Sequence, residues 1–513
     1  MEAQKPIKKR RFSIRKLILF VFLIIILILI GISEIGPVTY DKNYSGPHPE
    51  PVYNRSLSES EMALPFDGYR RDFVGERSIK VNYPAPIEKP VIQWSRKFMN
   101  PFPDKLVTDN KGGTLYFEFI SPLDEDYPKT SDLDPKRPIR ILRKLKPDNT
   151  ISWKRYYDWD REYIPVSVCN GAVVWLIKSW SFRGFSPDYK RMVSDFFKVI
   201  FGIPFCEASL ECVDNDGNVV WRTQKEKIGT EHFFWGSAWR ISGNRIMMPT
   251  GRFNSGTFNI FSLSDGKLLE SVKFSGWNSG SSEYGPLSPI EIPGKGWIGF
   301  QRSGIVLFGS SMKKIWKYGI PIKKFRSQPY ILGDRLIVST VDYIEGIDIE
   351  SGKMVWTNAD YASAVLKIAE KDENVLFFTT NPNAIEFPYF NAIDNNGKLL
   401  ISNLYQVWDP KGYPYSSSFI GDIYTVVYKD GKILMYDNKW LGLFEKNGAA
   451  IWRMNLEELG FSSKSDDIEQ ILWAPDNRLV LYMRAHSTST YSGGRGEYVV
   501  SLKFNNGEKI VAQ

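Results

Sequence analysis

Histidine is the residue type with the clearest catalytic potential in this chain, which contains only His48, His232 and His486. His232 lies in the stretch TEHFFWGSAWRISGNRIMM, and Arg240 follows it in the same stretch. A neutral imidazole can act as a nucleophile, and a guanidinium can hold the anion that is transferred. His232 and Arg240 are therefore the candidate catalytic residues. The alternative is a structural histidine packed among the aromatic residues 233–235.

Other catalytic or metal-binding patterns are absent from the sequence. It contains no Ser/His/Asp motif, no phosphate-binding loop and no zinc-ligand spacing. The turn at 214–217 is acidic, but a calcium loop needs further oxygen ligands at fixed positions and usually a glutamate twelve residues on, which do not follow. The acidic clusters at 124–128 and 158–162 are typical of solvated loops. We therefore expect no metal and no cofactor.

Three cysteines define the possible disulfide chemistry. Cys206 and Cys212 are close in the sequence, and a local disulfide between them is expected if this segment lies outside the cytosol. Cys169 lies in the apolar run VSVCNGAVVW, where a buried thiol is the simpler interpretation.

The elements that must position these side chains are β-hairpins. Aromatic residues make up 14% of the chain, which favours strands. One hairpin type has an apolar strand, a polar turn and a short strand that often ends in Trp, as in CVDNDGNVVWRT, whose Asp-Gly pair is a strong turn signal. It occurs eight times. Five copies end in a tryptophan, namely Trp153, Trp221, Trp316, Trp356 and Trp452.

A second hairpin type, a turn followed by a strongly apolar strand, alternates with the first and also occurs eight times. The clearest complete unit spans residues 327–358 and has four strands. Repeated four-stranded units indicate the blades of a propeller, because one such sheet cannot bury both faces alone. The fold class is therefore all-β, an eight-bladed β-propeller over residues 91–513. Residues 91–97 should complete the last blade and close the ring.

The tryptophans of these hairpins are expected to pack between adjacent blades rather than bind a ligand. The six blade-packing candidates are Trp94, Trp153, Trp221, Trp316, Trp356 and Trp452.

The Asp/Asn-x-x-Gly-Lys-x-x-Trp hairpin resembles the repeat of quinoprotein-like (PQQ-like) β-propellers over roughly residues 91–513. Members that are dehydrogenases hold PQQ with adjacent cysteines, Ca²⁺ ligands and an Asp base. This chain has no Cys-Cys pair to match them, so the resemblance implies the architecture without PQQ. The stretch DNDGNVVW…EH…SGNRIMM is similar to the repeat of bacterial arylsulfotransferases, in which a channel histidine carries the sulfuryl group. That resemblance places His232 and Arg240 in an enzymatic role, although the other seven units have no histidine at the matching place.

The N-terminus has the pattern of a membrane anchor. Residues 1–16 carry a net charge of +6 out of +8 for the whole chain, so the folded part is nearly neutral and nucleic-acid binding is not expected. Residues 17–33 are almost entirely apolar and long enough to span a bilayer as a signal anchor. The alternative is a cleaved signal peptide. The basic tail predicts a cytoplasmic N-terminus and an extracytoplasmic propeller, periplasmic or at the cell surface.

Two segments depart from the repeat pattern. Residues 34–90 are rich in Pro, Ser and charge, which predicts a semi-extended stalk. Residues 182–206 interrupt the second unit and contain an amphipathic helix signal, for which three roles remain open: membrane contact, partner contact, or packing on the propeller's own rim.

Two functions follow from these observations. The first is a non-enzymatic, membrane-anchored propeller that binds or scaffolds a protein or a cell-envelope ligand. The second is an arylsulfotransferase-like enzyme that uses His232.

Overall fold

The computed structural model describes residues 51–58, 78–81 and 84–504, with internal gaps of which the longest are 99–105, 128–138, 181–205, 229–239, 251–255, 275–286, 360–366, 381–388, 405–423 and 486–496. Within these residues the structure is all-β, with one short 3-10 helix at Leu456–Leu459. The expected tail (1–16), the transmembrane segment (17–33) and nearly all of the helical excursion (182–206) lie outside the described residues. Among the residues that are described, no helix is long and apolar enough to cross a membrane.

The described strands form eight sheets, numbered here in chain order. Sheets 1 to 4 take their strands from residues 52–318. Sheet 1 comprises β4 (Val107–Thr108), β5 (Thr114–Ile120), β6 (Ile139–Leu145) and β7 (Ile151–Asp158). Sheet 2 comprises β8 (Arg161–Cys169), β9 (Ala172–Trp180), β10 (Cys206–Asp214) and β11 (Val219–Arg222), with β12 (Glu226–Ile228) on β10 and β1 (Val52–Tyr53) on β11. Sheet 3 comprises β13 (Arg240–Ser242), β14 (Arg245–Thr250), β15 (Thr257–Ser262) and β16 (Leu268–Lys273). Sheet 4 comprises β17 (Ile290–Ile292), β18 (Gly296–Gln301), β19 (Gly304–Phe308) and β20 (Lys314–Tyr318).

Sheets 5 to 8 follow the same antiparallel order, with two additions from the N-terminal part of the chain. Sheet 5 comprises β21 (Tyr330–Leu332), β22 (Arg335–Ser339), β23 (Ile344–Asp348) and β24 (Met354–Asn358). Sheet 6 comprises β25 (Lys367–Lys371), β26 (Val375–Thr380), β27 (Tyr389–Asp394) and β28 (Leu399–Leu404). Sheet 7 comprises β29 (Tyr424–Tyr428), β30 (Ile433–Tyr436), β31 (Trp440–Phe444) and β32 (Ala450–Asn455), with β2 (Ser78–Val81) beside β29. Sheet 8 comprises β33 (Asp466–Ala474), β34 (Arg478–Ala485), β35 (Glu497–Lys503) and β3 (Val91–Phe98).

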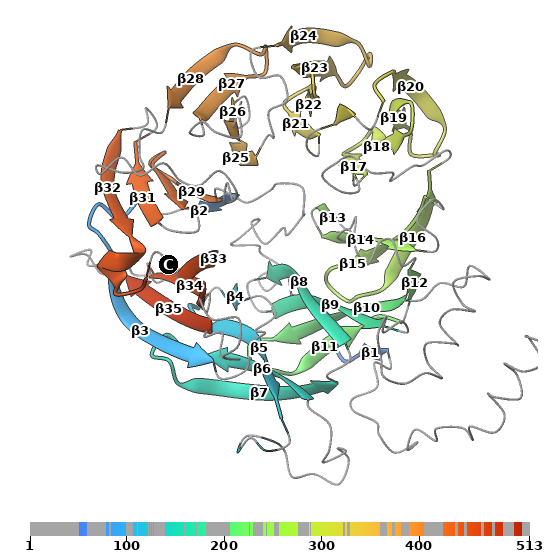
Figure 1. Cartoon of the computed structure of the whole chain (residues 1–513). Helices are drawn as coiled ribbons and strands as arrows, with labels where there is room; N and C mark the ends of the chain where they lie inside the picture. Colours follow the sequence, from blue (N-terminus) through green and yellow to red (C-terminus); the bar gives the residue numbers. More distant parts are fainter. Residues whose placement is uncertain are drawn as a thin grey trace, which may run out of the picture.

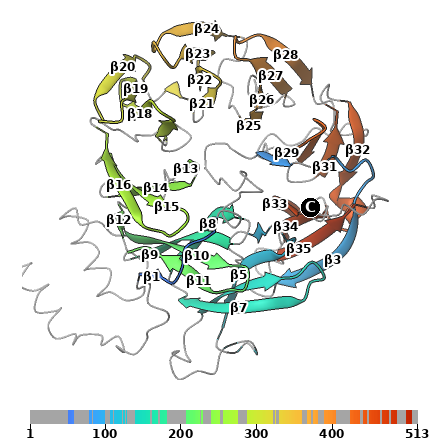
Figure 2. The same ribbon diagram turned by 180° about the vertical axis from the view of Figure 1, so that it is seen from behind.

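The sheets are arranged radially in a ring, with the first strand of each toward the centre and the fourth at the rim (Figure 1). The view from behind shows the same order (Figure 2). Small antiparallel sheets placed radially around a centre are the arrangement of a β-propeller. The predicted all-β propeller is therefore confirmed at this level.

The turn before each outer strand explains why the hairpins recur. In sheet 2 the Asp214 amide donates to the carbonyl of Asn218 and the Gly217 amide donates to that of Asp214, at 2.9 and 3.1 Å. Gly217 has φ of +87°, a left-handed conformation that glycine adopts without a steric penalty. The ladder between β10 and β11 shifts register beside this turn, as expected for a bulged hairpin. The Asp-x-x-Gly pattern in the sequence is thus the signature of this bulged turn.

Sheet 8 joins the two ends of the repeat region. Its outer strand β3 pairs antiparallel with β35, with Val91 opposite Lys503 and Phe98 opposite Glu497. The prediction that residues 91–97 complete the last sheet is confirmed.

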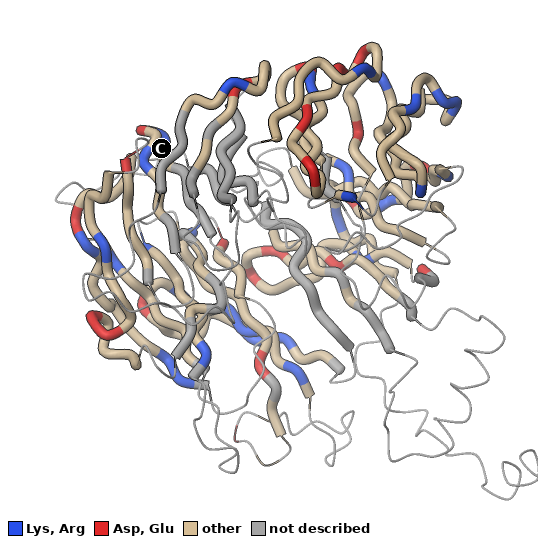
Figure 3. The backbone as a smooth tube through the Cα atoms, turned by 45° about the horizontal axis from the view of Figure 1, so that its top comes forward, with Lys and Arg blue, Asp and Glu red and all other residues tan. Residues whose placement is uncertain are grey.

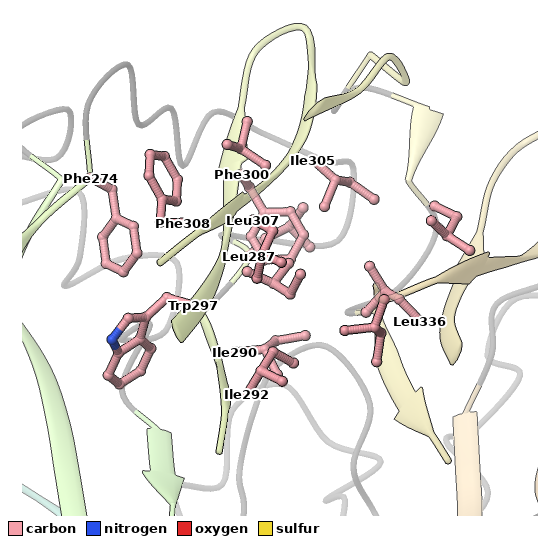
Figure 4. Close-up of a cluster of buried hydrophobic side chains, with 14 of the residues drawn as sticks. Phe274, Leu287, Ile290, Ile292, Trp297, Phe300, Ile305, Leu307, Phe308 and Leu336 are labelled. Atoms are coloured by element: carbon pink, nitrogen blue, oxygen red, sulfur yellow. The ribbon is translucent and has the colours of Figure 1, made fainter. Parts of the chain in front are cut away.

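The hydrophobic core lies between neighbouring sheets. Figure 4 shows the cluster around sheet 4, where Phe274 from the end of sheet 3 meets Trp297 and Phe308 edge-on, with ring centroids 6.3 and 5.5 Å apart. Leu336 of sheet 5 belongs to the same cluster. A second cluster joins Tyr116 of sheet 1 to Val480 of sheet 8. In both clusters, neighbouring sheets bury their faces against each other.

Three described stretches of the 34–90 segment lie on these sheets. β1 pairs antiparallel with the outer edge of β11, and β2 pairs parallel with β29 at the inner edge of sheet 7. Between β2 and β3, the Ala85 amide donates to Asp430 at 3.2 Å. In these places the segment expected as a stalk is part of the sheet structure.

Candidate functional site

The candidate catalytic residues are only partly placed by the structure. His232 lies outside the described residues. Arg240 begins β13, the innermost strand of sheet 3, which faces the middle of the ring (Figure 1). Among the described residues, no group of three or more His, Cys, Asp or Glu side chains is arranged to hold a metal ion. A site built on His232 therefore stays a prediction.

The two cysteines of the expected disulfide lie at separate points of one strand. β10 runs continuously from Cys206, which is opposite Trp180, to Cys212, which is opposite Val174. At about 3.3 Å per residue, the strand places their Cα atoms roughly 20 Å apart. A disulfide needs Cα atoms within about 7 Å. The expected Cys206–Cys212 disulfide does not fit this strand, and Cys212 is fully buried in the core.

The acidic turn at 214–217 uses its carboxylate to hold its own backbone. Asp214 Oδ1 accepts hydrogen bonds from the amides of Asp216 and Asn218, at 3.0 and 2.8 Å. The same carboxylate faces the Arg55 guanidinium at 3.7 Å. These contacts explain the recurrence of the Asp in structural terms.

The six blade-packing tryptophans all lie in outer strands, and most reach across to another part of the ring. Five indole Nε1–H groups donate to backbone carbonyls at 2.8–3.2 Å: Trp94 to Pro147, Trp153 to Asn215, Trp316 to Ile349, Trp356 to Asn395 and Trp452 to Pro86. The first four acceptors lie in the turn before the outer strand of the next sheet around the ring. Each such indole therefore ties one sheet to its neighbour.

Glycines in the receiving turns make room for these indoles. A Cβ placed on Gly352 would lie 2.5 Å from Trp316, and one on Gly397 would lie 2.4 Å from Trp356. The tryptophan of one sheet and the glycine turn of the next sheet thus form a single contact, to which each of two hairpins contributes one residue. We call such a contact between neighbouring sheets a joint.

Trp221 makes a variant of this joint. Its indole packs on Gly266 of sheet 3, but its Nε1 has no hydrogen-bond partner among the described residues. The carbonyl of Ser264 in the receiving turn accepts instead from the Leu57 amide, at 2.8 Å. Leu57 is buried beside Trp221 in the same hydrophobic cluster. The N-terminal stretch, residues 52–57, therefore forms part of the joint between sheets 2 and 3.

The joint between sheets 8 and 1 is held by a buried arginine. Arg478 donates to the carbonyl of Gly112, to that of Pro147 at 3.4 Å and to the Ser501 hydroxyl at 3.1 Å. Trp94 donates to the same Pro147 carbonyl. Sheet 8 contains both ends of the repeat region, and this joint connects it to sheet 1.

The N-terminal stretch also covers the outer edge of sheet 2. The amides of Asn54 and Arg55 donate to the carbonyl of Val220, at 3.0 and 3.4 Å, and Asn54 Nδ2 donates to the carbonyl of Val219 at 2.7 Å. Under this cover Val220 is only 1% exposed. An added strand thus seals both the backbone and the apolar side chains of β11.

Four consecutive outer strands present aliphatic side chains to solvent. They are β16, β20, β24 and β28, and the exposed residues are Leu268, Leu269, Ile315, Met354, Val355, Leu399 and Leu400. Val355 precedes its tryptophan as Val220 does, yet it is 48% exposed. Neighbouring strand residues point to opposite faces, so the exposed pairs leave both faces of these edges open. We call these seven residues the apolar rim.

Lysines accompany the apolar rim. Lys313, Lys314, Lys353 and Lys398 lie between the turns and the exposed aliphatic residues of sheets 4 to 6, and sheet 3 has Lys267, paired with Asp265 at 2.8 Å. Elsewhere basic and acidic residues are interspersed along the described sheets (Figure 3). The rim therefore combines aliphatic side chains with positive charge.

Sequence reasoning missed both the covering stretch and the apolar rim. The hairpin pattern of Gly-Lys followed by two aliphatic residues, as in GKMVW and GKLLI, was a usable signal for the rim. No periodic signal marks residues 52–57, because only a short stretch pairs there.

No protein-family model matches the sequence, and no curated protein matches it. Solved structures match by fold. The quinohemoprotein alcohol dehydrogenase ADHIIG of Pseudomonas putida HK5 matches with 10% identity and a TM-score of 0.45 over 87% of this chain and 80% of that chain. The dihydro-heme d1 dehydrogenase NirN matches with 10% identity and a TM-score of 0.41 over 80% and 79%. The β-propeller domain of Cps50 (Swd1) from Myceliophteria thermophila matches with 11% identity and a TM-score of 0.33 over 58% and 92%. These identities and scores are low, so the propeller assignment rests on the arrangement of the sheets themselves.

Proposed function

We propose that the chain is a membrane-anchored, extracytoplasmic propeller whose eight sheets are its eight blades, and that it binds an extended segment of a partner protein along the apolar rim. The anchor is residues 17–33, and the propeller acts as a binding or scaffold module. The observation that carries the proposal is the cover on β11, where the chain's own residues add a strand to an outer edge.

The cover on β11 provides the pattern for binding at the rim. Strand addition joins backbone groups of an extended peptide to a sheet edge, and alternate side chains supply specificity. On β11 this burial removes Val220 from solvent, whereas Val355 remains exposed at the corresponding place. A partner segment laid along β24 or β28 would bury the equivalent aliphatic side chains.

The lysines of the rim define the chemistry of that segment. Lys353 and Lys398 directly precede the exposed pairs of β24 and β28. Complementary charge favours encounter and selects against other partners. We therefore propose a segment in which aliphatic residues alternate with Asp or Glu.

Site-specific photo-crosslinking in cells that express the full-length chain tests this binding. A photoreactive residue at Val355 or Leu400 should give a discrete protein adduct, and Met354→Asp should abolish the adduct at Val355. The matched control is Leu123, which is 95% exposed but lies away from the rim. A photoreactive residue there should give no adduct, and Leu123→Asp should leave the adduct at Val355 intact. Equal labelling at Leu123 and Val355, or no adduct at either rim position, would contradict the proposal.

The membrane placement has a separate test. If the anchor assignment holds, a protease added outside intact cells (or spheroplasts, if there is an outer membrane) should cleave the propeller but spare residues 1–16. Protection of the propeller would contradict the extracytoplasmic placement.

An arylsulfotransferase-like activity is the second candidate, supported by the place of Arg240 at the start of an innermost strand. The test is sulfuryl transfer from an aryl sulfate to a phenol by the purified chain, with His232→Ala as control. Activity that survives His232→Ala would exclude His232 as the nucleophile.

A further inference from the structure

Sheets 2 and 5 each carry a glutamate at one equivalent buried position. Glu211 in β10 lies three residues before Asp214, and Glu345 in β23 lies three residues before Asp348. Both residues are fully buried, and both meet a tyrosine from the outer strand of the preceding sheet. They are thus two versions of one sheet-to-sheet contact.

Glu211 is fully compensated. Tyr157 of β7 donates its hydroxyl to Oε1 at 2.6 Å, and Arg222 donates to Oε2 through Nε at 2.6 Å and through its second nitrogen. Arg222 is directly opposite Glu211 in the ladder between β10 and β11. The guanidinium thus places two charge-assisted hydrogen bonds on one oxygen of this buried carboxylate.

Glu345 has the tyrosine but lacks the arginine. Tyr318 of β20 donates its hydroxyl to Oε2 at 3.0 Å, and Oε1 is buried without a hydrogen-bond partner in the part of the chain that the structure describes. The residue opposite Glu345 on β24, where sheet 2 has Arg222, is Thr357. A buried carboxylate without a counter-ion is costly when it is ionised.

Among the described residues that surround Glu345, the cations are engaged elsewhere or absent from the facing positions. On β22 the opposite residue is Val338, and the strand's Arg335 is paired with Asp334 and Asp348. On β20, Lys317 donates to Ser303 and Tyr318 is the titratable group in contact. Burial raises the pKa of the Glu345 carboxyl to about 7, against a smaller lowering by the Tyr318 hydroxyl.

We propose that the joint between sheets 4 and 5 is a proton-sensitive contact, tight when Glu345 is protonated and loosened when it is ionised. At the equivalent joint between sheets 1 and 2, Glu211 has Arg222 as its counter-ion. The raised pKa fixes the sign: the stabilisation is complete below the ordinary carboxyl pKa of 4.5 and is lost as the pH rises through about 7. The joint therefore loosens on passing from acidic to mildly basic medium.

Hydrogen–deuterium exchange of the full-length chain in non-ionic detergent tests the proposal at the joint itself. The readout is the opening constant of the amides in β20 and β23, with each variant compared at the same pH so that intrinsic exchange rates cancel. For a carboxyl pKa of about 7 when closed and about 4.5 when open, the opening constant should rise about 70-fold between pH 5 and pH 8. Glu345→Gln should remove nearly all of this rise, because the amide cannot ionise.

Three further variants keep the test falsifiable. Thr357→Arg should supply the missing counter-ion and flatten the pH response, which converts the joint to the type in sheet 2. Tyr318→Phe removes the hydroxyl that stabilises the ionised form and should move the midpoint to higher pH. Glu211→Gln is the matched control and should leave the response of β20 and β23 unchanged. The proposal is overturned if Glu345→Gln retains the full rise, or if Thr357→Arg and Tyr318→Phe both behave as the unsubstituted chain.

Discussion

Gly352→Ala should weaken the joint between sheets 4 and 5 by more than a left-handed glycine position alone can explain. Gly352 has φ of +67°, and a Cβ there would lie 2.5 Å from Trp316 Cδ2 and 2.7 Å from Cγ. The backbone penalty for a non-glycine residue is about 1–2 kcal/mol. Displacement of the indole adds about 1–3 kcal/mol of overpacking. It also breaks the hydrogen bond from Trp316 Nε1 to the Ile349 carbonyl at 2.9 Å, which contributes about 1 kcal/mol.

Gly294→Ala is the matched control for the backbone term. Gly294 has φ of +74°, and a Cβ added there would have no atom within 4 Å, so only the penalty of about 1–2 kcal/mol applies. Gly352→Ala should therefore cost about 3–6 kcal/mol, roughly 2–4 kcal/mol more than the control. Both values would be measured as free energies of unfolding in urea for the full-length chain in detergent.

A double-mutant cycle with Trp316→Phe isolates the contact. The smaller ring leaves space for the added methyl group, so the cost of Gly352→Ala should fall toward that of Gly294→Ala, with a coupling of at least about 1 kcal/mol. Equal costs for the two glycine substitutions in the unsubstituted chain, or no coupling in the cycle, would refute the view that the indole and the glycine form one joint.

Two other substitutions probe buried charge. Arg222→Met removes the guanidinium that donates twice to Glu211 Oε2, so the free energy of unfolding in urea should fall by about 3–5 kcal/mol; a loss below about 1 kcal/mol would contradict the compensation argument. Arg478→Ala leaves the Gly112 carbonyl without its side-chain donor in a buried joint, and the free energy of unfolding in urea should fall by about 2–4 kcal/mol. Arg478→Lys should recover part of this loss. A loss below about 1 kcal/mol for Arg478→Ala would show that the joint does not depend on this side chain.

The repeat architecture was predictable because each hairpin encodes its own turn. Asp214 and Gly217 fix a bulged turn through local backbone bonds, so the sequence pattern and the structure correspond directly. Contacts between sheets were harder to predict. The difference between Glu211 and Glu345 depends on whether the residue opposite is Arg222 or Thr357, and that register becomes visible only when the strands are paired.

The N-terminal additions were beyond sequence reasoning for a different reason. β1 and β2 pair with strands from the second and seventh sheets, far away in the sequence, and β2 pairs parallel to its neighbour. Short extended stretches without periodicity have no local signal that selects such a partner. The Cys206–Cys212 disulfide was inferred from spacing alone, and spacing does not reveal that both residues belong to one extended strand.

The pairing of β3 with β35 constrains the order in which the chain can fold during synthesis. β3 leaves the ribosome about 400 residues before the strand that it pairs with. At a synthesis rate of about 5–20 residues per second, it waits for about 20–80 s. Throughout this interval Val91 and Ile92 belong to an unpaired strand, which is a hazard for association with other nascent chains. Pairing of β3 with β35 therefore cannot precede the synthesis of β35, and chaperones that shield an early strand would act before it.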